Sequence, residues 1–428
     1  MKKLFALLEE GVTAAHAVEF VKKDLLSAGF LELSLGDEWN LQENTGYYVN
    51  LYHTNAVAFK TGRMTGKKPV FRIAMAHSDY PNFQIKPEPM VKGKNVTKLN
   101  VEIYGGMYQK SWLDRPLGVA GRIIISGKNA FEPESLLYKS DLNLCIIPSL
   151  AIHMDFELNK KGALDTAKEL VPLMSLCEQS DILAYIAKEM GIEKDKILDY
   201  DLYLYNKEGP VLVGIDQSML AAPKLDNLTS VSAISESLGQ TAPPDDTIDV
   251  MVIFDNEEVG SRSKQGADSE LFPLILERIC SSLHLEGFEK SDIMANGFLL
   301  SIDVAHAHHP NYEEKSDVTN KAYLGNGFCI KRSVGQKYGT TADTAAVLKT
   351  ICDKEKIPYS IAINRTGISG GATLGPIVTA HLPMPCADIG MPVLSMHSAM
   401  ELGAVADYHA LKDFIKAYYA YRVSGCSL

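Results

Sequence analysis

The chain has 428 residues, of which 46% are hydrophobic and 22% charged, and its formal net charge is −11. These values are ordinary for globular domains and exclude collagen-like, disordered and disulfide-scaffold classes. The acidic balance argues against nucleic acid or an anionic membrane as a partner, because either normally requires a basic surface.

Strand-like and helical patterns alternate at both ends of the chain. In chain order, the apolar spacing predicts a helix at 14–28, a strand at 70–76, a helix at 228–238, a strand at 250–254, a helix at 269–285, a strand at 297–302 and a helix at 404–421. Strands that alternate with helices are typical of an α/β domain with a mainly parallel sheet. Ligands of such sheets gather at the carboxyl ends of the strands.

The middle of the chain has a different pattern. From about residue 88 to residue 214, short β-rich pieces are separated by charged turns, and the clearest helix lies at 181–190. We therefore predict a discontinuous α/β domain made of residues 1–87 and 215–428. Residues 88–214 are predicted to form a second, β-rich domain inserted into it.

Histidines and carboxylates concentrate in five segments, most of which directly follow an apolar run. His77 and Asp79 are two residues apart, so in extended backbone they face the same side. Asp79 can then accept a hydrogen bond from the imidazole, as carboxylates do beside metal-binding histidines. A surface turn is the alternative. Asp226 precedes a helical pattern, where an aspartate is also a common N-cap.

The segment 254–260 carries the strongest signal. Three acidic residues stand among four polar ones, directly after a buried strand and before a glycine turn. One of Glu257 and Glu258 can bind a metal while the other faces the open coordination position and takes a proton from water. The alternative is a solvated acidic turn.

Two later segments add an aspartate and several histidines. Asp303 ends a predicted strand and precedes His306, His308 and His309. Because neighbouring histidines do not easily bind one tetrahedral ion together, we expect Asp303 to be the ligand and the histidines to pack or support it. His397 follows an apolar run, and taken alone it would be an ordinary core histidine.

These nitrogen and oxygen ligands, without thiolate, suit zinc, with cobalt or manganese as substitutes. If Asp226 bridges two ions, each ion has three protein ligands, and Glu257 stays unligated. One ion is then held by His77, Asp226 and Asp303, and the other by His397, Asp226 and Glu258. A bridging hydroxide would balance the charge, as in two-metal hydrolases whose ions lie roughly 3.5–4 Å apart.

At this point the sequence resembles the aspartyl aminopeptidase family of dinuclear zinc metallopeptidases. The resemblance runs from the segment of His16 almost to the C-terminus. It includes Phe-Asp-Asn-Glu-Glu-Val-Gly-Ser at 254–261, Asp-x-Ala-His-Ala-x-His-Pro-Asn-Tyr at 303–312, Tyr-x-x-x-Ala at 338–342, Leu-Gly-Pro at 374–376 and Met-His-Ser at 396–398. Two segments depart from the family pattern, at 77–81 and 369–373, and both bear on side-chain preference.

The resemblance implies the same five metal ligands, namely His77, Asp226, Glu258, Asp303 and His397. It also implies Glu257 as the general base. Asp79, which the spacing places beside His77, is expected to assist catalysis through that histidine. The fold that the resemblance implies is a zinc-peptidase catalytic domain interrupted by a dimerisation domain, assembled into a tetrahedral homododecamer. It further implies that His153 enters a neighbouring subunit's site, and that Lys331 and Tyr338 contact substrate, with Lys331 pairing with a substrate carboxylate.

The expected activity is removal of the N-terminal residue from peptides, with acidic residues preferred. The alternatives are an aminopeptidase for neutral residues, an endo-acting relative and a non-catalytic peptidase-like shell. A serine hydrolase built on Gly-Ile-Ser-Gly-Gly at 367–371 is disfavoured, because Ser369 is followed by glycine and then proline instead of a helix.

The sequence also predicts where the protein resides. Only Leu4 to Leu8 separate the first lysines from Glu9 and Glu10, which is too short for a signal-peptide core. No run approaches the ~20 apolar residues that cross a bilayer. The seven cysteines contain no Cys-x-x-Cys pair, as is typical of reduced thiols. We therefore expect a cytoplasmic protein.

Overall fold

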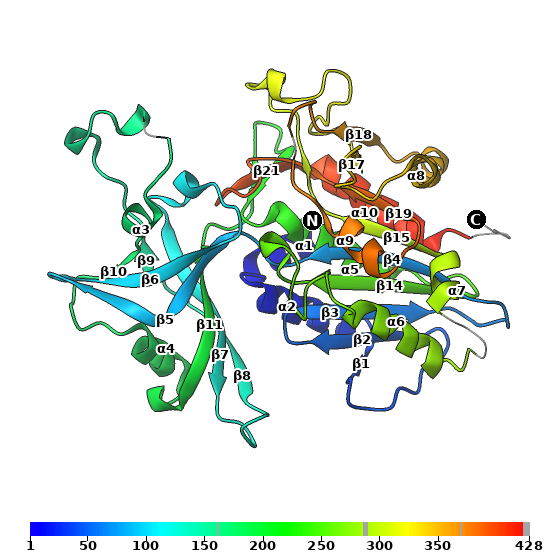
Figure 1. Cartoon of the computed structure of the whole chain (residues 1–428), viewed down its shortest axis with the longest axis horizontal. Helices are drawn as coiled ribbons and strands as arrows, with labels where there is room; N and C mark the ends of the chain where they lie inside the picture. Colours follow the sequence, from blue (N-terminus) through cyan, green and yellow to red (C-terminus); the bar gives the residue numbers. More distant parts are fainter. Residues whose placement is uncertain (161, 286–289, 369, 423–428) are drawn as a thin grey trace. The chain divides into compact units, whose positions relative to one another are not determined.

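The computed structural model describes residues 1–160, 162–285, 290–368 and 370–422. The chain divides into two compact units (Figure 1). The first unit comprises Met1–Asp79, Pro210–Met396 and Glu401–Leu428, and the second comprises Tyr80–Gly209 and His397–Met400. Residues 88 and 214 remain predictions of where an independently folding insert would begin and end.

The first unit is built on a large mixed sheet. Within the described residues it has nine strands in the order β1-β2-β3-β14-β4-β15-β19-β17-β18. The neighbours of β4 and β15 are parallel, whereas β2–β3, β3–β14 and β17–β19 pair antiparallel. The α/β fold with a mainly parallel sheet is therefore confirmed. The strands are β1 (Leu31–Leu33), β2 (Gly46–Leu51), β3 (Asn55–Thr61), β4 (Val70–His77), β14 (Thr247–Phe254), β15 (Gly297–Ile302), β17 (Phe328–Arg332), β18 (Tyr359–Ile363) and β19 (Cys386–Gly390).

Helices cover both faces of this sheet, because successive residues of a strand point to opposite faces. In β4, Ala74 and Ala76 pack in one apolar core with α1 (Lys2–Glu10), α2 (Ala14–Ser27), α5 (Leu225–Gln240), α8 (Ala342–Glu355) and α10 (Val405–Ala420). The intervening Ile73 and Met75 pack in a second core with α6 (Leu271–Ser282), α7 (Lys290–Ala295) and α9 (Leu374–His381). Burial on both faces explains why β4 reads as a continuous apolar run.

The predicted elements of this unit are present, with small shifts at their ends. The strand predicted at 297–302 is β15, and those predicted at 70–76 and 250–254 lie within β4 and β14. The helices predicted at 14–28, 228–238, 269–285 and 404–421 correspond to α2, α5, α6 and α10. The structure begins α5 at Leu225, although Asp226 and Asn227 have non-helical backbone angles.

A smaller sheet also belongs to the first unit. Its five strands, counted within the described residues, run in the order β12-β13-β21-β20-β16. They are β12 (Val211–Val213), β13 (Met219–Ala222), β16 (Ala305–His306), β20 (Pro392–Leu394) and β21 (Glu401–Ala404). Because β16 follows Asp303 by only one residue, this sheet holds the chain that leaves the carboxyl end of β15.

The second unit is an antiparallel β structure. Its strand order is β11-β5-β6-β10-β9-β7-β8 in the described part of the chain, and a further pairing of β11 with β7 closes it into a barrel. The strands are β5 (Asn82–Gly93), β6 (Val96–Tyr104), β7 (Pro116–Ile125), β8 (Glu134–Lys139), β9 (Cys145–Ile146), β10 (Leu173–Ser175) and β11 (Ile197–Asn206). The prediction of a β-rich second region is thereby confirmed.

Two helices accompany the barrel, α3 (Thr166–Glu169) and α4 (Ile182–Met190). The Asp181 side chain caps α4 by accepting hydrogen bonds from the amides of Leu183 and Ala184. Gly191 ends the helix in the left-handed region at φ 68°. These are the start and stop that the sequence predicted for a helix at 181–190.

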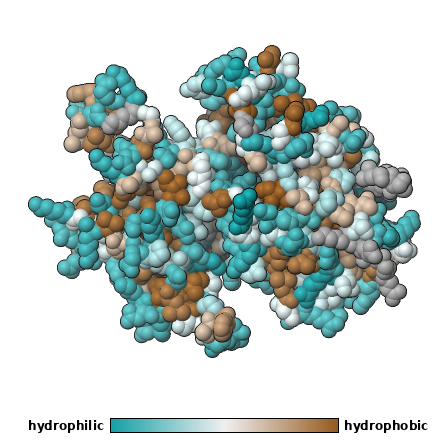
Figure 2. Space-filling view, viewed as in Figure 1, coloured by the Kyte–Doolittle hydropathy of each residue, from teal (hydrophilic) through white to brown (hydrophobic). Residues whose placement is uncertain are grey.

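The surface is mostly hydrophilic. Figure 2 shows polar side chains over most of the face drawn, interrupted by smaller hydrophobic patches. In the second unit, Leu150, Ile152, Met154 and Phe156 form an exposed apolar segment, with Phe156 73% exposed. Among the described residues, we find no helix with both the length and the apolar character needed to cross a membrane.

Candidate metal centre

Three neighbouring strands of the large sheet end beside one another. His77 is the last residue of β4 and pairs in register with Phe254, the last residue of β14. On the other side of β4, the parallel strand β15 ends at Ile302, directly before Asp303. Because parallel strands end at the same edge of a sheet, the side chains that follow them gather there.

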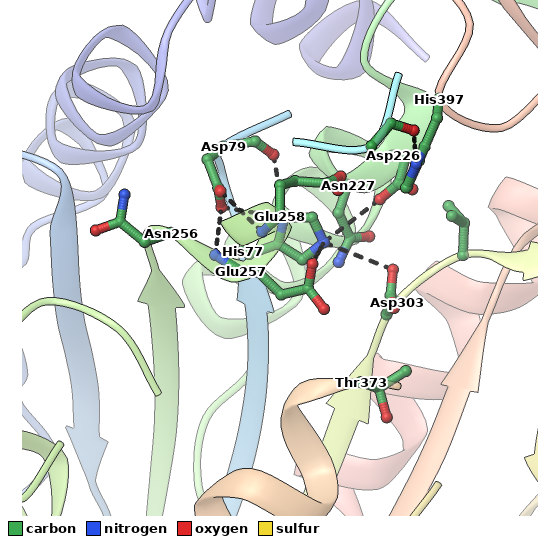
Figure 3. Close-up of polar contacts among 12 residues, drawn as sticks. His77, Asp79, Asp226, Asn227, Asn256, Glu257, Glu258, Asp303, Thr373 and His397 are labelled. Carbon is green, nitrogen blue, oxygen red and sulfur yellow. Dashed lines mark hydrogen bonds and ion pairs between the residues drawn. The ribbon is translucent and has the colours of Figure 1, made fainter. Parts of the chain in front are cut away.

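Three carboxylates converge on the imidazole of His77 (Figure 3). Its Nε2 lies 3.4 Å from Asp226 Oδ1, 3.6 Å from Asp303 Oδ1 and 3.9 Å from Glu257 Oε2. His77 is buried, at 1% exposure. Sequence patterns had placed all four residues in one candidate site, and within the first unit the structure brings them together.

Asp79 connects the histidine to the glutamate turn. Its backbone carbonyl lies 3.1 Å from His77 Nδ1, and its Oδ1 lies 3.4 Å from the same nitrogen. Its carboxylate also accepts hydrogen bonds from the amides of Glu257 (3.2 Å) and Glu258 (3.1 Å). A proton on Nδ1 then satisfies Asp79 and leaves Nε2 as the ring nitrogen that can bind a metal.

The two glutamates project from a tight turn directly after β14. Glu257 to Val259 form a short 3₁₀ helix, flanked by Asn256 at φ 61° and Gly260 at φ 98°. A 3₁₀ helix has three residues per turn, so the adjacent glutamates point in different directions. The amide of Ser261 donates to the carbonyl of Asn256 at 2.7 Å and closes the turn.

The backbone at Asp226 is held by Glu401, which sequence patterns did not indicate, and by the neighbouring Asn227. The amide of Asp226 donates to Glu401 Oε2 at 2.9 Å. Its neighbour Asn227 donates from Nδ2 to the carbonyl of Ile302 at 2.8 Å. This second bond ties the start of α5 to the end of β15, next to Asp303. An asparagine after an aspartate gives only an N-cap signal in the sequence, so its partner could not be inferred.

The electrostatics of this edge favour bound cations. Burial raises the pKa of Glu257 to about 8, and the carboxylates of Asp303 and Asp79 add to the rise while His77 opposes it. Burial lowers the pKa of His77, but Glu257 and the other carboxylates raise it well above the usual value. Buried carboxylates this close together require compensating positive charge.

The donor atoms fit a divalent metal such as zinc. Two groups in the first unit bring their ligand atoms within 4.8 Å of one another, His77–Asp226–Asp303 and His77–Glu257–Glu258. Both combine an imidazole nitrogen with carboxylate oxygens, which is the donor set of catalytic zinc sites that contain no cysteine. The site chemistry therefore fits zinc, and the roles of the individual ligands stay predictions.

Lys331 lies between this edge and a neighbouring pocket. Its Nζ donates to the carbonyls of Val304 (2.9 Å) and Asp303 (3.3 Å), and lies 3.5 Å from Asp303 Oδ2. The same ammonium stands 4.7 Å above the ring of Tyr338. Both side chains line a pocket of about 270 Å³. The two residues predicted to contact substrate are thus neighbours.

The three clustered histidines line this pocket instead of joining the groups around His77. His306, His308 and His309 share the pocket wall with Asn364 and Arg365. His308 Nδ1 lies 2.8 Å from Ser316 Oγ, and His309 Nδ1 accepts a hydrogen bond from the amide of Asn311. That these histidines pack against or support Asp303 stays a prediction.

Two predicted site residues belong to the second unit, and their roles remain predictions. His397 Nδ1 lies 2.9 Å from the carbonyl of Gly106, and its own carbonyl accepts from the amide of Tyr108. His153 is exposed in a 3₁₀ helix at Ile152–Met154, with its ring 6.2 Å from that of Phe156. Ser369, the alternative nucleophile, and Cys426 lie outside the described residues.

Comparison with known sequences gives a consistent result over nearly the whole chain. The profile described as aminopeptidase I zinc metalloprotease (M18) matches residues 7–419. The probable M18 family aminopeptidase 2 of Clostridium novyi (strain NT) is 39% identical over 423 residues, which cover 97% of this chain and 98% of the relative. The protein of the same description from Streptomyces coelicolor is 34% identical and covers 97% and 96%.

Solved structures share the fold. A chain of the Ape4 and Nbr1 complex matches with a TM-score of 0.92 and 29% identity, covering 97% of this chain and 84% of that one. The mApe1 structure of Chaetomium thermophilum matches with a TM-score of 0.86 and 26% identity, covering 97% and 96%. The S. cerevisiae mApe1 dodecamer matches at 0.84 with 23% identity, covering 98% and 95%, and this similarity concerns the fold alone.

Proposed function

The chain belongs to the aminopeptidase I zinc metalloprotease (M18) family and is a zinc aminopeptidase, and on this premise we propose that it hydrolyses the N-terminal residue from peptides with Glu257 as general base. The convergence of three carboxylates on the buried Nε2 of His77 is the observation that supports this most strongly. The sequence order of the site residues supports it as well.

Five residues would hold two zinc ions. One ion would be held by His77, Asp226 and Asp303, and the other by Asp226, Glu258 and His397. When bound, the ions would polarise the peptide carbonyl and lower the pKa of a water molecule. His77 and Asp303 extend from neighbouring parallel strands, so the sheet itself sets their separation. Such rigid support suits a site whose geometry must be maintained during turnover.

Glu257 would move the proton. Its carboxylate takes a proton from the attacking water and delivers it to the amine that leaves. Its Oε2 lies 3.9 Å from His77 Nε2, so the carboxylate stands beside the atoms that would hold the metals and the attacking water. The hydrogen bond from its amide to Asp79 fixes the turn from which the carboxylate reaches. Asp79 therefore assists by orienting both His77 and Glu257.

Acidic N-terminal residues are the proposed preference. Lys331 is 3% exposed and lines the pocket beside Tyr338. Its ammonium would pair with a substrate carboxylate in a site largely removed from water, where such a pair is stronger than at the surface. Arg365, Lys315 and Lys321 also line this pocket and outnumber Asp317, the one acidic residue among its described lining, so the pocket wall is positively charged on balance. A preference for neutral residues is the competing outcome.

We further propose that the protein assembles into a homododecamer built from dimers. The exposed apolar segment Leu150–Ile152–Met154–Phe156 in the second unit supports this, because exposed apolar clusters mark interaction surfaces. His153 lies within that segment. If the second units of two subunits pack together, His153 would therefore enter the active site of the neighbouring subunit. The S. cerevisiae mApe1 structure of the same fold is a dodecamer.

One experiment tests the reaction, the metal and the preference together. Initial rates are measured on aminoacyl reporters with aspartyl, glutamyl, leucyl and alanyl groups, free or N-acetylated, before and after chelation. We expect hydrolysis of free N-termini only, loss on chelation, and recovery with zinc, cobalt or manganese. Equal rates on acetylated substrates would refute the exopeptidase assignment. Full zinc occupancy with no turnover on any reporter would support a non-catalytic shell instead.

The assembly is tested separately by sedimentation of the wild type and of Phe156→Ser. We expect twelve subunits for the wild type and smaller species for the variant. Replacing His153 with alanine should lower turnover while the assembly stays intact. A wild type that sediments as a monomer with full activity would contradict the proposed role of the second unit.

A further inference from the structure

We propose that Asp388 is a positioning residue that sets the shape of the substrate side-chain pocket by anchoring the loop of Tyr338 beside Lys331. The proposal rests on the aminopeptidase function above and adds a determinant of its side-chain selectivity. Asp388 does not line the pocket and is not among the residues that sequence patterns indicated. An aspartate inside the apolar strand 386–390 was the available signal.

Asp388 lies at the centre of the pocket's supporting structure. It is fully buried in β19 and stands directly opposite Lys331 on the antiparallel strand β17. Its Oδ2 accepts from the amide of Gly339 at 2.5 Å, and its Oδ1 accepts from Thr373 Oγ1 at 2.6 Å. One carboxylate thus joins the loop before α8 to the residue that precedes α9.

These bonds fix the backbone on both sides of Tyr338. On its C-terminal side, Gly339 is bound by Asp388. On its N-terminal side, the carbonyl of Lys337 accepts from the amide of Thr373 at 3.3 Å. Thr373 in turn donates its hydroxyl to Asp388. The residues before and after Tyr338 are therefore both held in place, directly or indirectly, by Asp388. Figure 3 includes Thr373 among the side chains drawn with the metal-site residues.

The loop has little room to move while these bonds are intact. A Cβ placed on Gly339 would lie 3.0 Å from Cys386 Sγ, so the loop backbone rests directly on β19. The hydroxyl of Thr340 accepts from the amide of Asp388 at 2.8 Å and adds a second attachment. The ring of Tyr338, 5% exposed, therefore meets the ammonium of Lys331 in a position that the Asp388 network determines.

A second buried aspartate provides a matched comparison. Asp407 is also fully buried, and it accepts from the amides of Gly325 and Gly327, each at 2.8 Å. Neither glycine lines the pocket. If buried aspartates that bind loop amides act only through general stability, Asp388→Asn and Asp407→Asn should have similar kinetic effects. If Asp388 positions the pocket, the two variants should differ.

The test uses the full-length zinc-loaded protein and the aminoacyl reporters. Asp388→Asn keeps the shape of the side chain, but its amide nitrogen cannot accept a hydrogen bond. Thr373→Val removes the bond at nearly constant volume. We expect KM for aspartyl and leucyl reporters to rise about 10-fold in both variants, which is the scale of a lost hydrogen bond to a charged group. For the alanyl reporter, which barely enters the pocket, KM should change less than about 2-fold.

Four further measurements make the result decisive. Thr373→Ser should restore the wild-type KM, Asp407→Asn should leave the ratio between reporters unchanged, and zinc content should be constant. Hydrogen exchange of the Gly339 amide should accelerate in both Asp388→Asn and Thr373→Val. If Asp388→Asn does not fold, Thr373→Val decides alone.

The proposal would be overturned if KM rose equally for all reporters, including the alanyl one. It would also be overturned if hydrogen exchange of the Gly339 amide stayed at the wild-type rate in the variants. A wild type that is inactive on every reporter would refute the aminopeptidase function instead. The exchange measurement would still report whether Asp388 anchors the loop.

Discussion

Two buried aspartates hold two functional loops of the first unit by similar means, and the loops have opposite character. Asp79 accepts hydrogen bonds from the amides of Glu257 and Glu258, whereas Asp388 accepts from the amide of Gly339 and the hydroxyl of Thr373. The first loop presents carboxylates to the edge where metals would bind. The second presents Tyr338 beside the cation of Lys331. The position of each loop is therefore set by its buried aspartate, and the charge that the loop presents is set by other residues.

The two regions also differ in how rigidly they are built. The metal-binding edge is formed where parallel strands end, and β4, β14 and β15 set its spacing. The pocket wall depends on β17, which is antiparallel to β19, and on a loop anchored by side chains. Changes at the first region should therefore affect chemistry and metal affinity, and changes at the second should affect substrate preference.

The largest expected effect comes from the general base. Glu257→Gln should lower kcat by a factor of about 10² or more, because an amide cannot take a proton from water. Zinc content, measured by mass spectrometry, should equal that of the wild type. The matched control is Glu277→Gln, an exposed glutamate on α6, which should keep full activity. An active Glu257→Gln protein would remove this residue from the mechanism.

A smaller effect is expected from Asp79→Asn. The amide can accept only one of the two hydrogen bonds from the glutamate turn, and it orients His77 less well. Zinc affinity should fall about 10- to 100-fold, as for other outer partners of metal ligands. Competition with a chelating dye measures this affinity. Asp388→Asn is the matched variant in the pocket wall and should keep wild-type zinc affinity. If both variants lost zinc affinity equally, the two regions would not have the separate roles described above.

The pocket is tested by Lys331→Met, which keeps the length of the side chain and removes its charge. The ratio of kcat/KM for aspartyl over leucyl reporters should fall about 10-fold, as expected when a charged hydrogen bond is lost. Lys337→Met is the control for the loss of a lysine charge. The ammonium of Lys337 donates to the carbonyl of Gly370, and Lys337 does not line the pocket. An unchanged ratio in Lys331→Met would show that acidic selectivity, if present, arises elsewhere.

The smallest effect concerns His381, which links α9, beside the pocket wall, to the segment that follows the metal-binding edge. His381, at the end of α9, lies 2.8 Å from both Asp268 and Glu270, in the segment that follows the glutamate turn. Hydrogen bonds with these carboxylates raise its pKa, so its stabilising contribution is complete below the unfolded value near 6.5 and is lost as pH rises through the folded pKa.

Because His381 is partly exposed, the contribution should be modest, about 1 kcal/mol or less. His381→Gln should therefore lower the unfolding temperature by about 1 °C or less at pH 6 and have still less effect at pH 9, because a chain of 428 residues has a large entropy of unfolding. Thermal unfolding at both pH values measures the difference. An equal loss at both pH values would mean that the histidine acts through packing instead of charge.

Several features of this protein could be predicted from the sequence because they depend on local order. Apolar runs predicted β4, β14 and β15, and the polar residues at or shortly after the ends of these strands indicated His77, Glu257 and Asp303. Strand direction then predicts that residues at strand ends meet at one edge. Long motifs in the right order gave the family. Each of these inferences uses neighbours in sequence, where backbone geometry restricts side-chain direction.

Other features depended on tertiary structure. Asp79 and the amide of Glu257 are 178 residues apart, and Asp226 and Glu401 are 175 apart, yet each pair forms a hydrogen bond. Asp388 has no motif around it, and its role depends on the packing of β17, β19 and α9. Contacts between segments so distant in sequence arise when apolar faces pack, and the local pattern of residues does not specify which polar groups that packing brings together.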